Sequence, residues 1–184
     1  MREYGPKFGI TGKIVEREVF GDPAEFVEGR KKRDFGHEKY MSYRAAMQEV
    51  KDIQNNPENG MDPADPEKEF ANDLHASIAQ EITPDDYSKL RFYTAVETAL
   101  DHFHGVDAFF EVDLDNGKTA IITLDVTTNP NKLSYKADVI LHVPSDGVDR
   151  KVDPEEYGLV LKKSIKEVMG VIKYKTRERG AYAA

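Results

Sequence analysis

Hydrophobic residues recur every three or four positions in four stretches of the chain, which is the spacing of an amphipathic helix. Helices are therefore predicted over 39–55, 66–81 and 84–104, and a last one begins at Asp153-Pro154. Gly105 is well placed to end the third helix in a left-handed conformation. The four apolar faces are formed by Tyr43, Met47 and Val50, by Phe70, Leu74 and Ile78, by Tyr93, Val96, Leu100 and Phe103, and by Leu161, Ile165, Val168 and Ile172.

Two β-type stretches, 106–112 and 119–127, flank a segment that contains Asn116-Gly117. This pair favours a tight hairpin, so the two stretches are predicted to be adjacent antiparallel strands. With the turn centred on Asn116-Gly117, paired residue numbers sum to about 233, which sets Asp125 opposite about residue 108. The stretch 133–143 indicates a third, more buried strand.

The remaining segments are less regular. Residues 55–66 hold three prolines and a glycine and indicate a loop. Residues 1–38 indicate an extended arm or hairpin, with a β-rich run over 12–20. Together the elements predict an α/β (α+β) fold, in which helices flank a small mixed central sheet. A chain of 184 residues suits one domain, with the arm and helices of 1–82 packed on a core formed by 83–184.

Composition narrows the classes of function. Cysteine is absent, and we see neither a secretory signal nor an apolar run long enough for a membrane helix, so a soluble, cytoplasmic protein without membrane contact is expected. Any metal must then be held by oxygen or imidazole. A net charge of −8 argues against a protein that coats nucleic acid, but not against an enzyme that meets DNA at one groove. Basic clusters at 30–33 and 173–179 are candidates for phosphate contacts.

The candidate chemistry rests on Asp107 and Asp125, which the predicted hairpin makes neighbours. Asp125 lies in an apolar strand, where a charge is unfavourable unless it is paired or binds a metal. Two adjacent carboxylates repel each other, and a divalent cation such as Mg²⁺ between them relieves this. A bound Mg²⁺ lowers the pKa of its water and stabilises charge on a phosphate, which is the chemistry of phosphodiester hydrolysis.

Over residues 84–143 the chain resembles the PD-(D/E)xK superfamily of restriction-endonuclease-like nucleases. The matching residues are Asp107 on the first hairpin strand, Asp125 on the second, and Glu97 on the predicted helix before them. The resemblance implies a restriction-endonuclease-like core, Mg²⁺ or Mn²⁺ held by these three acids, and endonuclease or exonuclease activity on DNA. It departs at Thr127, where the family has a lysine. Family members with a displaced lysine make Lys132 and Lys136 the candidates, with a slight preference for Lys136.

Two other functions stay open. If neither lysine reaches the aspartates, the chain is a catalytically inactive relative that binds nucleic acid or protein; a lysine amine within about 4–6 Å of them favours an enzyme. A phosphohydrolase of small nucleotides would need a closed pocket rather than an open groove. Asp101 and His104 are expected to be peripheral to the site. Cleavage of both DNA strands would make a two-fold homodimer attractive.

Overall fold

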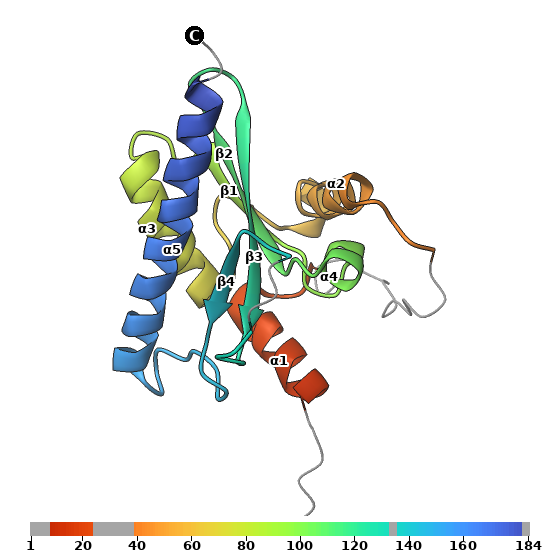
Figure 1. The fold of residues 1–184 in the computed structure, drawn as a ribbon, viewed down its shortest axis with the longest axis vertical. Coiled ribbons are helices and arrows are strands. Elements are labelled where there is room, and N and C mark those ends of the chain that lie inside the picture. The colour runs from red at the N-terminus through yellow and green to blue at the C-terminus, as the bar shows by residue number, and fades with distance from the viewer. Residues whose placement is uncertain (1–7, 24–38, 133–135, 182–184) are drawn as a thin grey trace, which may run out of the picture.

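The computed structural model describes residues 8–23, 39–132 and 136–181, and the side chains of 12–23, 39–132 and 136–177. A four-stranded sheet lies between two layers of helices (Figure 1). In chain order the elements are α1 (Phe8–Phe20), α2 (Tyr43–Gln54), the 3-10 helix η2 (Pro57–Asn59), α3 (Glu69–Ile82), the 3-10 helix η3 (Tyr87–Lys89), β1 (Leu90–Thr94), α4 (Ala99–His104), β2 (Ala108–Asp113), β3 (Thr119–Thr127), β4 (Val139–His142) and α5 (Pro154–Ala181).

The sheet has the strand order β1-β2-β3-β4. Strands β1, β2 and β3 form an antiparallel meander, and β4 pairs parallel to β3. The prediction of a small mixed sheet flanked by helices is therefore confirmed. A strand was expected over 133–143; β4 occupies its last part, and residues 133–135 lie outside the described residues.

Both faces of the sheet are covered because successive side chains of a strand point to opposite sides. Phe110 of β2 packs in a cluster with residues of α1, α3 and α5, whereas its neighbour Phe109 packs with residues of α2 and α4. Figure 1 shows α3 and α5 on one side of the sheet and α2 and α4 on the other. Odd-numbered residues of β2 therefore face α2 and α4.

The prediction of one helix over 84–104 is wrong, because β1 and the short α4 occupy this stretch. Residues Tyr93, Val96 and Leu100 do lie at helical spacing, but Leu90–Thr94 pairs along the open edge of β2. Phe92 packs on the α3 side and Tyr93 on the α2 side. Burial on both faces hides the alternation by which a half-exposed strand is recognised.

The N-terminal run 12–20 is also not extended, because it belongs to α1. Val15 and Val19 lie four residues apart, on one helical face, and both are buried in the main core cluster. The helix ends at Phe20, and the next residue, Gly21, has a φ of 80° and donates its N–H to the Arg17 carbonyl at 2.9 Å. Packing on α3 and β3 thus decides the helical state of a sequence whose local pattern is ambiguous.

The helices expected over 39–55, over 66–81 and from 153 onward are confirmed as α2, α3 and α5. The loop between α2 and α3 is confirmed too and includes η2. Val168 and Ile172 of α5 are buried, as its apolar face predicts. Within the described ranges, no helix is both long enough and apolar enough to cross a membrane.

Candidate metal centre

Asp107 lies where α4 passes into β2. Gly105, with a φ of 63°, ends α4 as predicted, and Asp107 follows two residues later at only 3% exposure. The Asp107 N–H donates to the Leu124 carbonyl at 2.9 Å, and its Oδ2 accepts the Val126 N–H at 2.7 Å. These bonds to the residues on either side of Asp125 place Asp107, just before β2, beside Asp125 of β3.

The hairpin register differs by one residue from the expected one. Ala108 pairs with Leu124, so paired numbers sum to 108 + 124 = 232 instead of 233. Leu114 N–H donates to the Lys118 carbonyl, which leaves three residues in the turn instead of two, with Gly117 at a φ of 73°. The ladder ends at the Ala108–Leu124 pair, because the Asp107 N–H also donates to the Leu124 carbonyl and so departs from the register by one residue.

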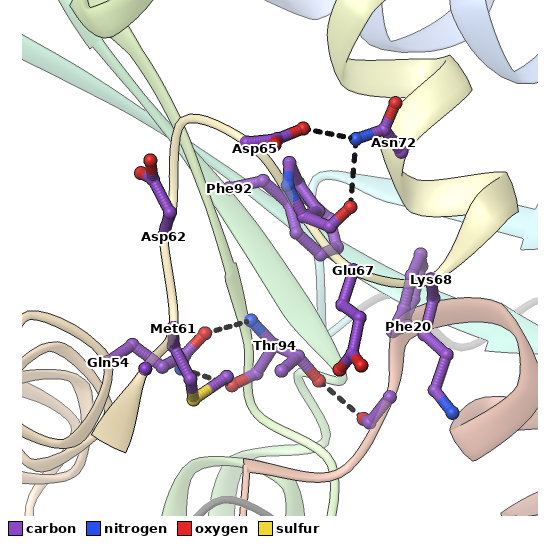
Figure 2. Close-up of a pocket in the computed structure, with 13 residues that line it drawn as sticks. Phe20, Gln54, Met61, Asp62, Asp65, Glu67, Lys68, Asn72, Phe92 and Thr94 are labelled. Atoms are coloured by element: carbon purple, nitrogen blue, oxygen red, sulfur yellow. Dashed lines mark hydrogen bonds between the residues drawn. The ribbon is translucent and has the colours of Figure 1, made fainter. Parts of the chain in front are cut away.

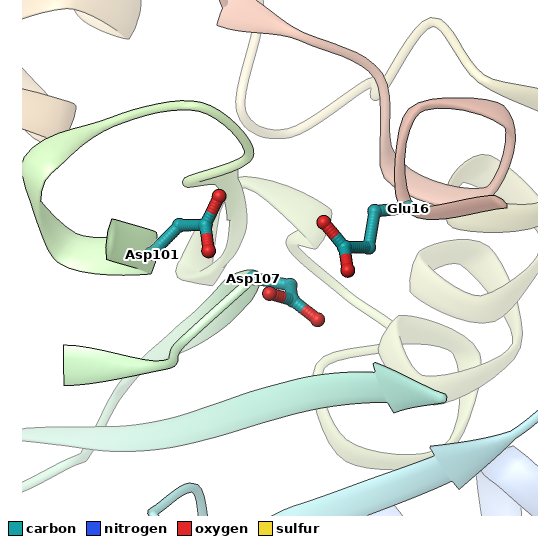
Figure 3. A group of neighbouring side chains, drawn as sticks. All are labelled: Glu16, Asp101 and Asp107. Atoms are coloured by element: carbon teal, nitrogen blue, oxygen red, sulfur yellow. The ribbon is translucent and has the colours of Figure 1, made fainter. Parts of the chain in front are cut away.

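Three carboxylates from separate elements meet at this point. Glu16 of α1, Asp101 of α4 and Asp107 each offer an oxygen within 4.8 Å of the others. Figure 3 shows the three side chains turned toward one another. We refer to Glu16, Asp101 and Asp107 as the acid triad. Carboxylate oxygens from several directions are the ligands that Mg²⁺ and Mn²⁺ accept, so the donor set fits such an ion.

The electrostatics of the acid triad favour a bound cation. Burial, and then the charge of Glu16, raises the pKa of Asp107 well above its usual range. Burial and then Asp101 raise the pKa of Glu16 to about 7, and burial raises the pKa of Asp101 as well. Each acid therefore resists ionisation beside the others. A divalent cation would remove this repulsion and allow all three to ionise.

Asp125 is paired with Lys132. The Lys132 Nζ lies 2.8 Å from Oδ1 and 2.6 Å from Oδ2 of Asp125, which is 6% exposed. Of the two candidate lysines, Lys132 is thus the one that reaches the aspartate pair, rather than the slightly preferred Lys136. The Lys136 side chain lies against Gly105, where an added β-carbon would come within 3.0 Å of its Cδ.

Thr127, at the position where the family has a lysine, stabilises the turn after β3. Its Oγ1 accepts the N–H of Asn129, and Asn129 accepts the N–H of Asn131 through its side chain and that of Lys132 through its carbonyl. These bonds fold the chain back after β3. The lysine is displaced along the sequence, and this turn returns its amine to Asp125.

Glu97 was expected on a helix, and this is wrong. It lies in the turn before α4, with a φ of 58°. Its Oε1 lies 2.5 Å from Nη2 of Arg17, and its N–H donates to Oδ2 of Asp101 at 2.9 Å. Glu97 therefore orients Asp101 and ties α1 to the turn before α4. The structure places it beside the acid triad, with its own carboxylate held by a cation.

Sequence reasoning missed two members of the acid triad. Asp101 was expected to be peripheral, and Glu16 lay in a segment assigned to an arm. Val15 and Val19 at helical spacing were the available signal for a helix carrying Glu16. Only the packing of α1 across the sheet brings that residue to Asp107.

The basic clusters do not add cations to this centre within the described residues. Cluster 30–33 lies outside them. In the cluster 173–179, Lys173 binds Glu81 at 2.8 Å, and Lys175 binds Asp138 at 2.6 Å and the Ile121 carbonyl at 2.8 Å. Lys173 thus joins α5 to α3, and Lys175 joins α5 to β3 and to the residue before β4.

A cavity of about 440 Å³ lies beside the C-terminal end of α1, between β1 and the loop before α3 (Figure 2). Phe20, Met61 and Phe92 form apolar parts of its wall, and Asp62 and Glu67 are among its polar residues. No member of the acid triad lines it. The cavity and the candidate metal centre are therefore separate features.

Comparison of the chain with protein-family models, with curated proteins and with solved structures finds no match.

Proposed function

We propose that this protein is a metal-dependent nuclease that hydrolyses phosphodiester bonds of DNA at the acid triad. The observation that carries the proposal is the convergence of Glu16, Asp101 and Asp107 beside the Asp125–Lys132 pair. Buried acids gathered at one point lower folding stability and suit a cation site. The hairpin that carries Asp107 and Asp125 also agrees with the resemblance to PD-(D/E)xK nucleases, and we propose a core of that kind.

Each residue has a defined part. Asp107 and Asp125, with Asp101 and Glu16 from the flanking helices, supply the oxygen ligands. A bound Mg²⁺ or Mn²⁺ would activate water and stabilise charge on the phosphate. The Lys132 ammonium, held within 2.8 Å of Asp125, orients the attacking water or offsets the negative charge that develops on the phosphate oxygens.

The position of Lys132 favours this function over that of an inactive binding module. An inactive relative needs no lysine at the aspartates, whereas here the amine is within hydrogen-bond distance of one of them. The phosphohydrolase of small nucleotides is less well supported, because no member of the acid triad lines the cavity beside β1.

The test is cleavage of supercoiled plasmid and end-labelled linear DNA with Mg²⁺ or Mn²⁺, with EDTA as the metal-free control. Asp107→Asn keeps an oxygen to accept the Val126 N–H and removes the charge, and we expect cleavage to fall on the order of 10³-fold. Lys132→Ala should lower it about 10²-fold. Matched controls are Asp115→Asn, in the exposed hairpin turn, and Lys118→Ala, which should cleave like wild type.

No cleavage by the folded wild-type chain on either substrate would favour the inactive binding module. Cleavage that survives Asp107→Asn would place the active centre elsewhere.

A further inference from the structure

Exposed rings gather where the start of α2 meets α4. Tyr40 is 71% exposed and Tyr43 43% exposed. The Tyr40 ring centroid lies 5.6 Å from Phe103 and 5.7 Å from His104, and that of Tyr43 lies 5.4 Å from His104. We call Tyr40, Tyr43, Phe103 and His104 the ring cluster. Single exposed aromatic residues are ordinary, but a contiguous group marks a surface that binds something.

The ring cluster is held in place before any ligand arrives. His104 Nε2 forms a 2.9 Å hydrogen bond with the Met41 carbonyl, which joins α4 to the segment that leads into α2. Ser42 caps α2 by accepting the Ala45 N–H. Rings fixed between two helices lose little conformational freedom on binding, so they offer a preformed platform.

Helix α4 connects the ring cluster to the acid triad. Asp101 and His104 lie three residues apart on it, about 60° around its axis and about 4.5 Å along it. Asp101 belongs to the triad and His104 to the rings. The acid triad and the ring cluster are therefore joined by residues that lie within one turn of each other on α4.

Three cations lie close to the ring cluster in the sequence or against the end of α4, and the charge of one acid, Asp138, also reaches Tyr43. Lys39 and Arg44 flank Tyr40 and Tyr43 in the sequence and are exposed, and Lys136 lies against Gly105 at the end of α4. Among the described residues, none of these three cations has an acid partner within 4.0 Å. Their charge is complementary to a phosphate backbone.

We propose that the ring cluster stacks unpaired bases, so that the substrate of the acid triad is single-stranded DNA, either free or as an overhang. The inference rests on the proposed nuclease function and names its substrate class. Bases within a duplex already stack on each other, whereas unpaired bases offer a free face to an aromatic side chain. Such stacking contributes about 1–3 kcal/mol per base, which is about 5- to 150-fold in affinity.

The first experiment measures binding without cleavage. A labelled 20-nucleotide strand of mixed sequence, and the same strand annealed to its complement, are titrated in EDTA and in Ca²⁺ with anisotropy as the readout. The wild type should prefer the single strand, and Tyr40→Ala should weaken binding to that strand about 10-fold, with a smaller loss in Tyr40→Phe. The matched control is Tyr174→Ala, at a 61% exposed tyrosine of α5. The chain has no tryptophan and nine tyrosines, so the part of the tyrosine quenching that is lost in Tyr40→Ala reports stacking on that ring.

The second experiment separates this inference from the nuclease itself. Cleavage of single-stranded, overhang and blunt duplex DNA is compared in wild type and Tyr40→Ala, with circular dichroism to show that each is folded. Tyr40-dependent binding of single strands without cleavage under any metal would support the ring cluster and overturn the nuclease. Duplex binding or cleavage that exceeds that of single strands and is unchanged in Tyr40→Ala would overturn the inference and leave the nuclease standing.

Discussion

Asp107 and Glu111 lie four residues apart, Asp107 just before β2 and Glu111 within it, and both are buried, at 3% and 4% exposure. Around Glu111 the charges are balanced: Lys51 Nζ lies 2.7 Å from Oε1 and Arg91 Nε lies 3.6 Å from Oε2. Around Asp107 they are not. Its neighbours are the carboxylates of Glu16, Asp101 and Asp125, and a backbone N–H is its hydrogen-bond donor.

The difference separates a structural charge from a functional one. Glu111 joins α2 to the sheet through Lys51, and its environment is complete without a ligand. Asp107 raises the free energy of the folded chain as long as nothing offsets its charge. Two acids that lie four residues apart with the same burial therefore differ in what surrounds them, and the environment without a cation, that of Asp107, is the one that suits a metal ion.

The largest effect on stability is expected at Glu111, whose charge is balanced by two cations. Lys51→Met removes the closest cation of a buried glutamate while keeping the aliphatic stem. The free energy of unfolding in urea should fall by about 2–3 kcal/mol, because Arg91 compensates the charge only from 3.6 Å. Adding Glu111→Gln should recover part of this loss. Lys163→Met, at an exposed pair 4.0 Å from Glu167, is the matched control and should change stability little. An unchanged free energy in Lys51→Met would show that the Glu111 network is not structural.

A change in stability of opposite sign is expected at Asp107, whose charge is not balanced. Asp107→Asn removes a buried charge, and in EDTA at pH 8 it should raise the free energy of unfolding by about 1–2 kcal/mol. In the wild type, Mg²⁺ at about ten times its dissociation constant should raise Tm by about 3–5 °C, and this rise should be absent in Asp107→Asn. Asp115→Asn should show neither effect. A wild-type Tm indifferent to Mg²⁺ and Mn²⁺ would count against a metal centre.

The smallest effect is a dependence on pH. The pKa of Glu16 is raised from 4.5 to about 7, mainly by burial and then by Asp101, so between these values the folded chain keeps a proton that the unfolded chain has released. Stability contributed by Glu16 is therefore greatest below about pH 4.5 and is lost as the pH rises toward about 7. Relative to Glu16→Gln, the wild type should lose on the order of 1 kcal/mol over this window without metal, and less with Mg²⁺. Parallel stability curves of the two proteins would contradict the raised pKa.

Local signals predicted the hairpin and its acids well. The Asn116-Gly117 pair placed the turn, and the two β-type runs placed Asp107 beside Asp125 before any tertiary contact was known. The register was wrong by one residue because the turn holds three residues, a choice that depends on the Leu114 hydrogen bond to Lys118. The displaced lysine was narrowed to two candidates, and the turn at Asn129 decides between them in favour of Lys132.

The sequence by itself determined α2, α3, α5 and the hairpin, because their hydrophobic spacing, caps and turn residues act within a few positions. It did not determine β1 or α1. Leu90–Thr94 forms a strand because its backbone groups pair with those of β2. Residues 8–20 form a helix because Val15 and Val19 are then buried in the main core cluster. The acid triad depends on both choices. Glu16 and Asp107 are far apart in the chain, and no local pattern encodes a meeting that the packing of α1 across the sheet alone creates.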